Sequence, residues 1–149
     1  MIPNQTVAQS DNYLLQRIIG ATPEQLCVLL LEGAQRFLLL AIGATKSRNV
    51  AEKAKYVNRV SAIIEELMIQ LNHDEESELV INLSRIYEWW MNQIFEASRA
   101  NKPETLELVY TQIGDIKATW EQLVQKNQSG AQLQSASPPA GGLGTEFFG

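Results

Sequence analysis

The sequence is poor in the residue types on which most enzyme and metal sites depend. Cys27 is the only cysteine and His73 the only histidine among the 149 residues. A single cysteine cannot form an internal disulfide, which fits a reducing cytoplasm. A di-metal centre in a helical bundle needs two pairs of Glu and His at i, i+3 spacing, and the chain has none. No phosphate-binding loop or zinc-ligand spacing occurs either. We therefore expect no metal, no cofactor and no enzymatic activity.

Long apolar runs, a targeting segment and excess positive charge are also lacking. There is no uninterrupted run of about 18 apolar residues, so membrane insertion is not expected. The first residues, MIPNQTVAQSD, do not combine a basic region with an apolar segment, so we expect no secretory signal. The net charge is −5 and the pI about 4.9, which argues against nucleic acid as the main partner. A cytoplasmic protein with a protein partner is the expectation.

The positive charges that are present are unevenly distributed. Five of the twelve basic residues fall within fourteen positions, and the charged residues between Glu65 and Glu78 are all acidic. Two interpretations remain open: solvated helix ends arranged as helix dipoles favour, or a charged docking surface. The clustered basic residues are Lys46, Arg48, Lys53, Lys55 and Arg59.

Apolar residues recur at helical spacing in four segments, and no segment shows the alternation typical of a strand. The first segment opens with a capping-box pattern of Thr22 and Gln25, and Pro23 takes the first helical position. The expected helices run from Thr22 to about Lys46, from Asn49 to about Leu71, from residues 74–77 to about Ala100, and from about Pro103 to Val124.

Four amphipathic helices joined by short loops predict an all-α fold, an antiparallel four-helix bundle. We assign residues 1–21 to an N-terminal arm and residues 22–126 to the bundle. Residues 127–149 are rich in Gly, Ser, Gln, Ala and Pro, which predicts a low-complexity disordered tail. Phe147-Phe148 at its end is a candidate docking element.

Apolar side chains exceed what one buried face of each helix can use. On the first helix we place the core stripe through Leu26, Phe37 and Leu40, so that other leucines fall on its flanks. Of the adjacent Trp89 and Trp90, only one can point fully inward. Exposed apolar surface of this extent marks a partner site, with an amphipathic helix as the expected ligand. The residues assigned to this binding surface are Tyr13, Ile18, Ile19, Val28, Leu31, Leu38, Leu39, Ile63, Ile81, Trp89 and Leu108.

The N-terminal arm carries Tyr13, Ile18 and Ile19 ahead of the first helix cap. In the free protein it could cover part of the binding surface and be displaced by the ligand. It could instead pack permanently as an apolar lead-in to the first helix.

Several short motifs, in order along residues 13–124, carry a family resemblance. They are Tyr13 and Ile18 ahead of Thr22-Pro23, Leu29-Leu30-Leu31-Glu32-Gly33 with Phe37, Ile63-Ile64-Glu65-Glu66-Leu67, Ile86-Tyr87-Glu88-Trp89, and Trp120-Glu121. As an ordered set they resemble the flagellin-specific export chaperones of the FliS family.

The resemblance implies a cytoplasmic chaperone that binds the disordered C-terminal segment of flagellin. Such a chaperone prevents premature polymerisation and keeps flagellin competent for flagellar type III secretion. The apolar binding surface would then be the flagellin site, and an export-gate component or a co-chaperone is a further candidate partner. The alternative is a self-associating helical adaptor or structural protein that uses the same apolar faces on a second copy.

Overall fold

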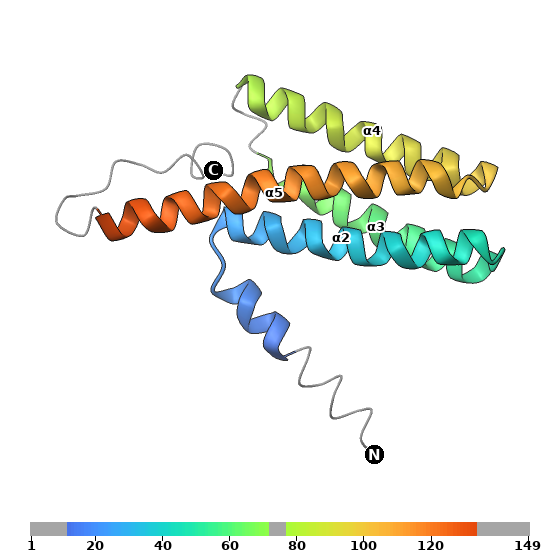
Figure 1. Ribbon diagram of the computed structural model, residues 1–149, viewed down its shortest axis with the longest axis horizontal. Helices are drawn as coiled ribbons and strands as arrows, with labels where there is room; N and C mark the ends of the chain where they lie inside the picture. Colours follow the sequence, from blue (N-terminus) through green and yellow to red (C-terminus); the bar gives the residue numbers. More distant parts are fainter. Residues whose placement is uncertain (1–11, 72–76, 134–149) are drawn as a thin grey trace, which may run out of the picture.

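The computed structural model describes residues 12–71 and 77–133, and these are helical apart from short connections (Figure 1). A short helix over residues 12–19 comes first. The four long helices are α2 (Pro23–Lys46), α3 (Val50–Gln70), α4 (Glu78–Ala100) and α5 (Pro103–Leu133). The predicted all-α class is confirmed.

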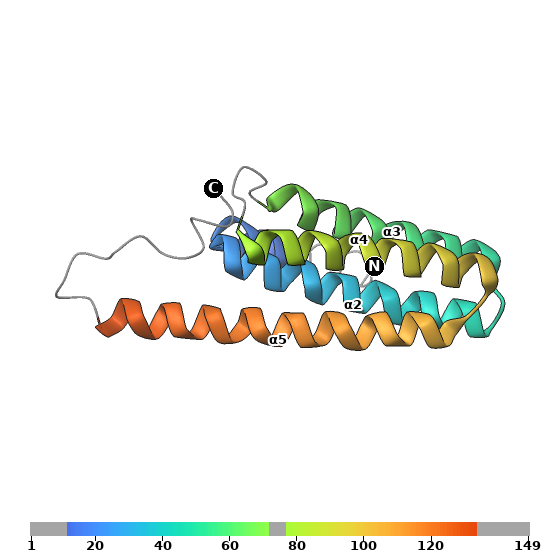
Figure 2. The same ribbon diagram turned by 90° about the horizontal axis from the view of Figure 1, so that it is seen from above.

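The four long helices pack as an antiparallel bundle in which each contacts two neighbours. Helix α2 lies against α3 and α5, and α4 closes the ring by contacting α3 and α5 (Figures 1 and 2). The α2–α3 side therefore lies across the bundle from the α4–α5 side. The N-terminal helix points away from the start of α2 (Figure 1), and α5 extends past that end of the bundle (Figure 2).

Side-chain caps fix where the helices begin and end. The Thr22 hydroxyl accepts from the Gln25 backbone N–H at 3.2 Å, and the Gln25 side chain accepts from the Thr22 N–H at 2.9 Å. This is the capping box predicted from the sequence. Asn49 and Ser77 cap α3 and α4 by accepting from the backbone N–H three residues on. Helix α4 ends at Asn101, whose left-handed backbone (φ 56°) turns the chain toward α5.

The core stripe of α2 recurs at alternating spacings of four and three residues, as in a helical bundle. Its neighbours approach closely: a Cβ at Gly33 would lie 3.3 Å from Ile63 Cδ1 of α3, and one at Gly114 of α5 would lie 2.9 Å from Gln35 Nε2 of α2. The glycines therefore allow α2 to pack tightly between α3 and α5. The stripe consists of Cys27, Leu31, Ala34, Leu38, Ala41 and Thr45, all buried.

This stripe corrects the predicted orientation of the first helix. Leu31 and Leu38, assigned to the binding surface, are 0% exposed, whereas Leu40, assigned to the core, is 44% exposed. Helix α2 is apolar around much of its circumference, so periodicity alone does not define which face is buried. Small residues such as Gly33 and Ala34 indicate the buried face of α2, because they lie where neighbouring helices approach it closely.

The C-terminal boundary also differs from the expectation. Helix α5 continues to Leu133, so residues 127–133, assigned to the tail, belong to a helix. His73, the remaining tail and Phe147-Phe148 lie outside the described residues. Val50, the first residue of α3, is exposed.

Among the described residues, α2 alone is long and apolar enough to cross a membrane, judged by length and composition. A core helix of a bundle meets the same criteria. In this structure the α2 stripe packs against α3 and α5, which accounts for its apolar character.

The neighbouring leucines of α2 give a direct test of this packing. Leu38→Ala should lower the free energy of unfolding by about 2–5 kcal/mol, because it leaves a cavity in the core. Leu39→Ala, at a side chain that is 52% exposed, should cost less than about 1 kcal/mol. Urea denaturation followed by circular dichroism measures both, and equal losses would contradict the observed orientation of α2.

Candidate functional site

A largely apolar hollow lies between α4 and α5. It has a volume of about 570 Å³, and Figure 1 shows α4 diverging from α5 toward its own N-terminal end. Four residues of α4 and three of α5 form its walls. They are Arg85, Ile86, Trp89, Trp90, Gln112, Asp115 and Ile116, and together they define what we call the α4–α5 groove.

The adjacent tryptophans divide the floor of this groove from its rim. Trp90 is fully buried, and its Nε1–H donates to Gln112 Oε1 at 3.0 Å, which ties α4 to α5. Trp89 is 39% exposed at the rim, and Ile86 and Ile116 are half-buried beside it. The expectation that only one tryptophan points inward is confirmed. An apolar groove of this kind suits the nonpolar face of a helical ligand.

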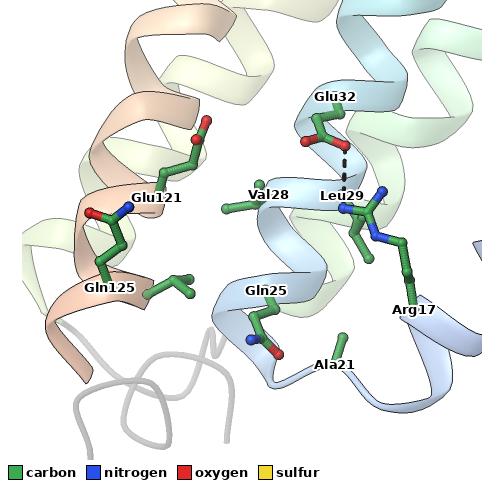
Figure 3. A pocket seen from close by; sticks show the side chains of 9 residues that line it. Arg17, Ala21, Gln25, Val28, Leu29, Glu32, Glu121 and Gln125 are labelled. Carbon is green, nitrogen blue, oxygen red and sulfur yellow. Dashed lines mark ion pairs between the residues drawn. The ribbon is translucent and has the colours of Figure 1, made fainter. Parts of the chain in front are cut away.

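A second hollow, of about 400 Å³, lies between the N-terminal helix, α2 and α5. Figure 3 shows Val28 of α2 opposite Glu121 and Gln125 of α5, with the Arg17–Glu32 ion pair at one side. Its lining is more polar than that of the α4–α5 groove. It is formed by Arg17, Ala21, Gln25, Val28, Leu29, Glu32, Glu121, Val124 and Gln125.

The N-terminal arm is held loosely. All side chains from residue 12 to residue 20 are exposed, Tyr13 among them at 65%. Arg17 and Glu32 lie 3.7 Å apart, both partly exposed, and such a surface pair contributes at most about 1 kcal/mol. The described part of the arm, from residue 12 on, neither packs into the core nor covers the α4–α5 groove.

The residues assigned to the binding surface do not form one continuous patch. Trp89 lines the α4–α5 groove and Val28 the hollow beside the arm. Leu39, Ile81 and Leu108 are exposed on α2, α4 and α5, and Ile63 is half-buried against the core.

Two residues that help form the α4–α5 groove were missed as binding residues. Ile86 and Ile116 recur at the same helical spacing as the buried apolar residues of α4 and α5, so periodicity alone does not separate them from buried neighbours. Only the pairing of α4 with α5 reveals that both line a hollow.

The lone cysteine is a buried packing residue. Burial raises the pKa of Cys27 to about 12, and the charge of Glu24 acts in the same direction. A hydrogen bond from the Tyr87 hydroxyl opposes this effect only partly, and burial also raises the pKa of Tyr87. A thiol kept neutral in this way is a poor nucleophile.

The geometry is that of a four-helix bundle with an apolar groove between two of its helices. The family model described as flagellar protein FliS matches residues 5–127. The chain therefore belongs to the FliS family of flagellar secretion chaperones, which is not an enzyme family.

Relatives from several bacteria agree with this assignment. The chain is 27% identical over 107 residues to the flagellar secretion chaperone FliS of Vibrio cholerae, covering 72% of this chain and 79% of that protein. It is 29% identical over 105 residues to FliSB of Pseudomonas aeruginosa, covering 70% and 83%. With FliS of Salmonella typhimurium it shares 26% identity over 110 residues, covering 73% and 82%.

Alkylation tests the state of Cys27. At pH 8 the native protein should react with iodoacetamide about a thousandfold more slowly than the urea-unfolded protein, because little thiolate is present in the fold. Mass spectrometry over time measures the two alkylation rates, and equal rates would show an accessible thiolate.

The raised pKa of Cys27 also makes the stability of the fold depend on pH. Since the pKa in the folded protein lies above the ordinary value of 9.0, the stability that this thiol contributes is complete below pH 9 and declines toward pH 12.

Proposed function

We propose that the protein binds the C-terminal segment of flagellin in the cytoplasm and holds it in a form that cannot polymerise. The bound subunit then stays competent for flagellar type III secretion. The observation that carries this proposal is an open apolar groove between α4 and α5 in a chain of the flagellar secretion chaperone family.

The chemistry of the α4–α5 groove suits a segment that folds as it binds. Trp89, Ile86 and Ile116 present apolar surface that an amphipathic helix would cover. Arg85 and Asp115 add one charge of each sign to the lining, so polar groups of the ligand would find partners there. A disordered segment loses conformational entropy on ordering, which keeps its affinity moderate over a large contact area.

The N-terminal arm supplies a second part of the proposed site. Tyr13, Ile18 and Ile19 are exposed next to the hollow that Val28 lines. Among the described residues the ion pair that joins the arm to α2 is weak, so little free energy opposes movement of this part of the arm onto a bound segment.

Mixing the protein with a flagellin C-terminal fragment tests the proposal. We expect a 1:1 complex by light scattering and a negative heat-capacity change by calorimetry, because apolar surface is buried. Trp89→Ala should weaken binding about tenfold or more, because it removes an aromatic anchor from the groove.

The matched control for this variant is Ile69→Ala, at an exposed apolar residue on α3 that lines none of the described hollows. It should leave the affinity unchanged. A stable homodimer that does not bind the fragment would favour the self-associating adaptor instead. Equal effects of the two substitutions would exclude the α4–α5 groove as the site.

Removal of residues 1–20 separates the role of the arm from that of the bundle. The Tm should stay within a few degrees of the full chain, because the described arm residues bury little surface. The affinity for the flagellin fragment should fall if Tyr13, Ile18 and Ile19 contact it. Tighter binding by the truncated chain would identify the arm as an inhibitory cover, and a large loss of Tm would identify it as part of the core.

A further inference from the structure

A cluster of cations and aromatic rings lies on the α2–α3 side of the bundle, across from the α4–α5 groove. The rings of Phe37 and Tyr56 stack with centroids 6.4 Å apart and planes at 23°. Arg36, Arg59 and Lys55 cover them. We call these five residues the basic–aromatic patch.

The cations of the patch are held in defined positions. The guanidinium carbons of Arg36 and Arg59 lie 5.5 and 5.6 Å from the centroid of the same Phe37 ring. The Lys55 ammonium lies 5.3 Å from the centroid of Tyr56. Stacking on a ring restricts these long side chains while leaving them exposed to solvent. Less conformational entropy is then lost when they bind an anion.

The positive charges of the patch are not neutralised within the described residues. Elsewhere on the surface Lys46 pairs with Glu107, and Arg99 with Glu96. Glu32, one turn before Arg36, pairs with Arg17. Both arginines lie beside the same Phe37 ring, so their guanidinium carbons are at most about 11 Å apart. This separation is comparable to the Debye length of about 8–10 Å, so an added acidic segment would reduce the repulsion between them.

A hollow with one apolar side continues from the patch along the α2–α3 side. The Tyr56 ring and the exposed Leu39 and Leu40 form its apolar side, and Ser47, Asn49 and the carboxylate of Glu52 line its polar side. It measures about 280 Å³. A ligand that carried carboxylates beside one apolar side chain would therefore match both the charges and the hollow.

We propose that the basic–aromatic patch binds an acidic peptide segment of another protein, with its carboxylates on Arg36 and Arg59 and an apolar side chain in the hollow beside Tyr56. Charge complementarity selects this occupant. A polyanion such as nucleic acid fits less well, because the whole chain carries a net charge of −5 and would repel it beyond the patch. This surface is separate from the proposed flagellin groove, so the two ligands do not compete for the same residues.

The probe is a synthetic peptide of repeated Glu and Leu, and its counterpart has every Glu replaced by Gln. Isothermal calorimetry should show 1:1 binding of the Glu peptide and none of the Gln peptide. The variant R36Q/R59Q should weaken binding about tenfold or more, because it removes charge-assisted hydrogen bonds. The control K102Q/K126Q removes the same amount of charge from exposed positions outside the patch and should change binding less than about twofold.

Several outcomes would overturn this proposal. They are no binding of the Glu peptide, equal binding of the Gln peptide, and equal losses in R36Q/R59Q and K102Q/K126Q. A single-stranded oligonucleotide that binds more tightly than the peptide and depends on the same arginines would reassign the patch to a polyanion. Binding of the flagellin fragment by R36Q/R59Q should stay unchanged, which keeps this test distinct from that of the α4–α5 groove.

Discussion

The bundle depends on the close packing of α2 between α3 and α5. Cys27, Ala34 and Ala41 on the α2 stripe are small, and Gly33 and Gly114 remove side-chain bulk where neighbouring helices approach. On the opposite side of the bundle, Tyr87 and Trp90 of α4 are large and face the core. Because the distance between helix axes follows the size of the side chains between them, α4 sits less tightly than α2. The α4–α5 groove is a consequence of this difference, since a tight α2 contact and a wide α4 contact leave a hollow along one edge.

The helix ends could be predicted from the sequence because they depend on local chemistry. Thr22 with Gln25, and Asn49, cap in the structure as their residue types indicate. The orientation of α2 could not be predicted in the same way. Leu38 and Leu39 are chemically identical neighbours on a helix that is apolar on most sides, and the contact with α3 and α5 decides which one is buried. Tertiary packing, rather than periodicity, fixes that choice.

The candidate site was harder to predict than the fold for the same reason. The α4–α5 groove is a property of a helix pair, and Ile86 and Ile116 are separated along the chain but lie in one hollow. Trp89 could be identified as a binding residue from the sequence because only one of two adjacent tryptophans on a helix can point into the core. The basic–aromatic patch shows the same limit: Lys55 and Arg59 belong to a recognisable basic run, whereas Arg36 joins them only through the packing of α2 on α3.

The two surfaces differ in the physical interaction that would drive binding, and this separates their roles. The α4–α5 groove offers mainly apolar area, with Arg85 and Asp115 of opposite sign in its lining. Binding there would be driven by the removal of apolar surface from water and would respond little to salt.

The patch offers positive charge with no ion-pair partner among the described residues, so binding there would weaken as salt rises. A chaperone that must hold a subunit firmly and then transfer it gains from such an arrangement. The subunit would be retained by burial on one side, while a second protein would engage the other side rapidly and reversibly through charge.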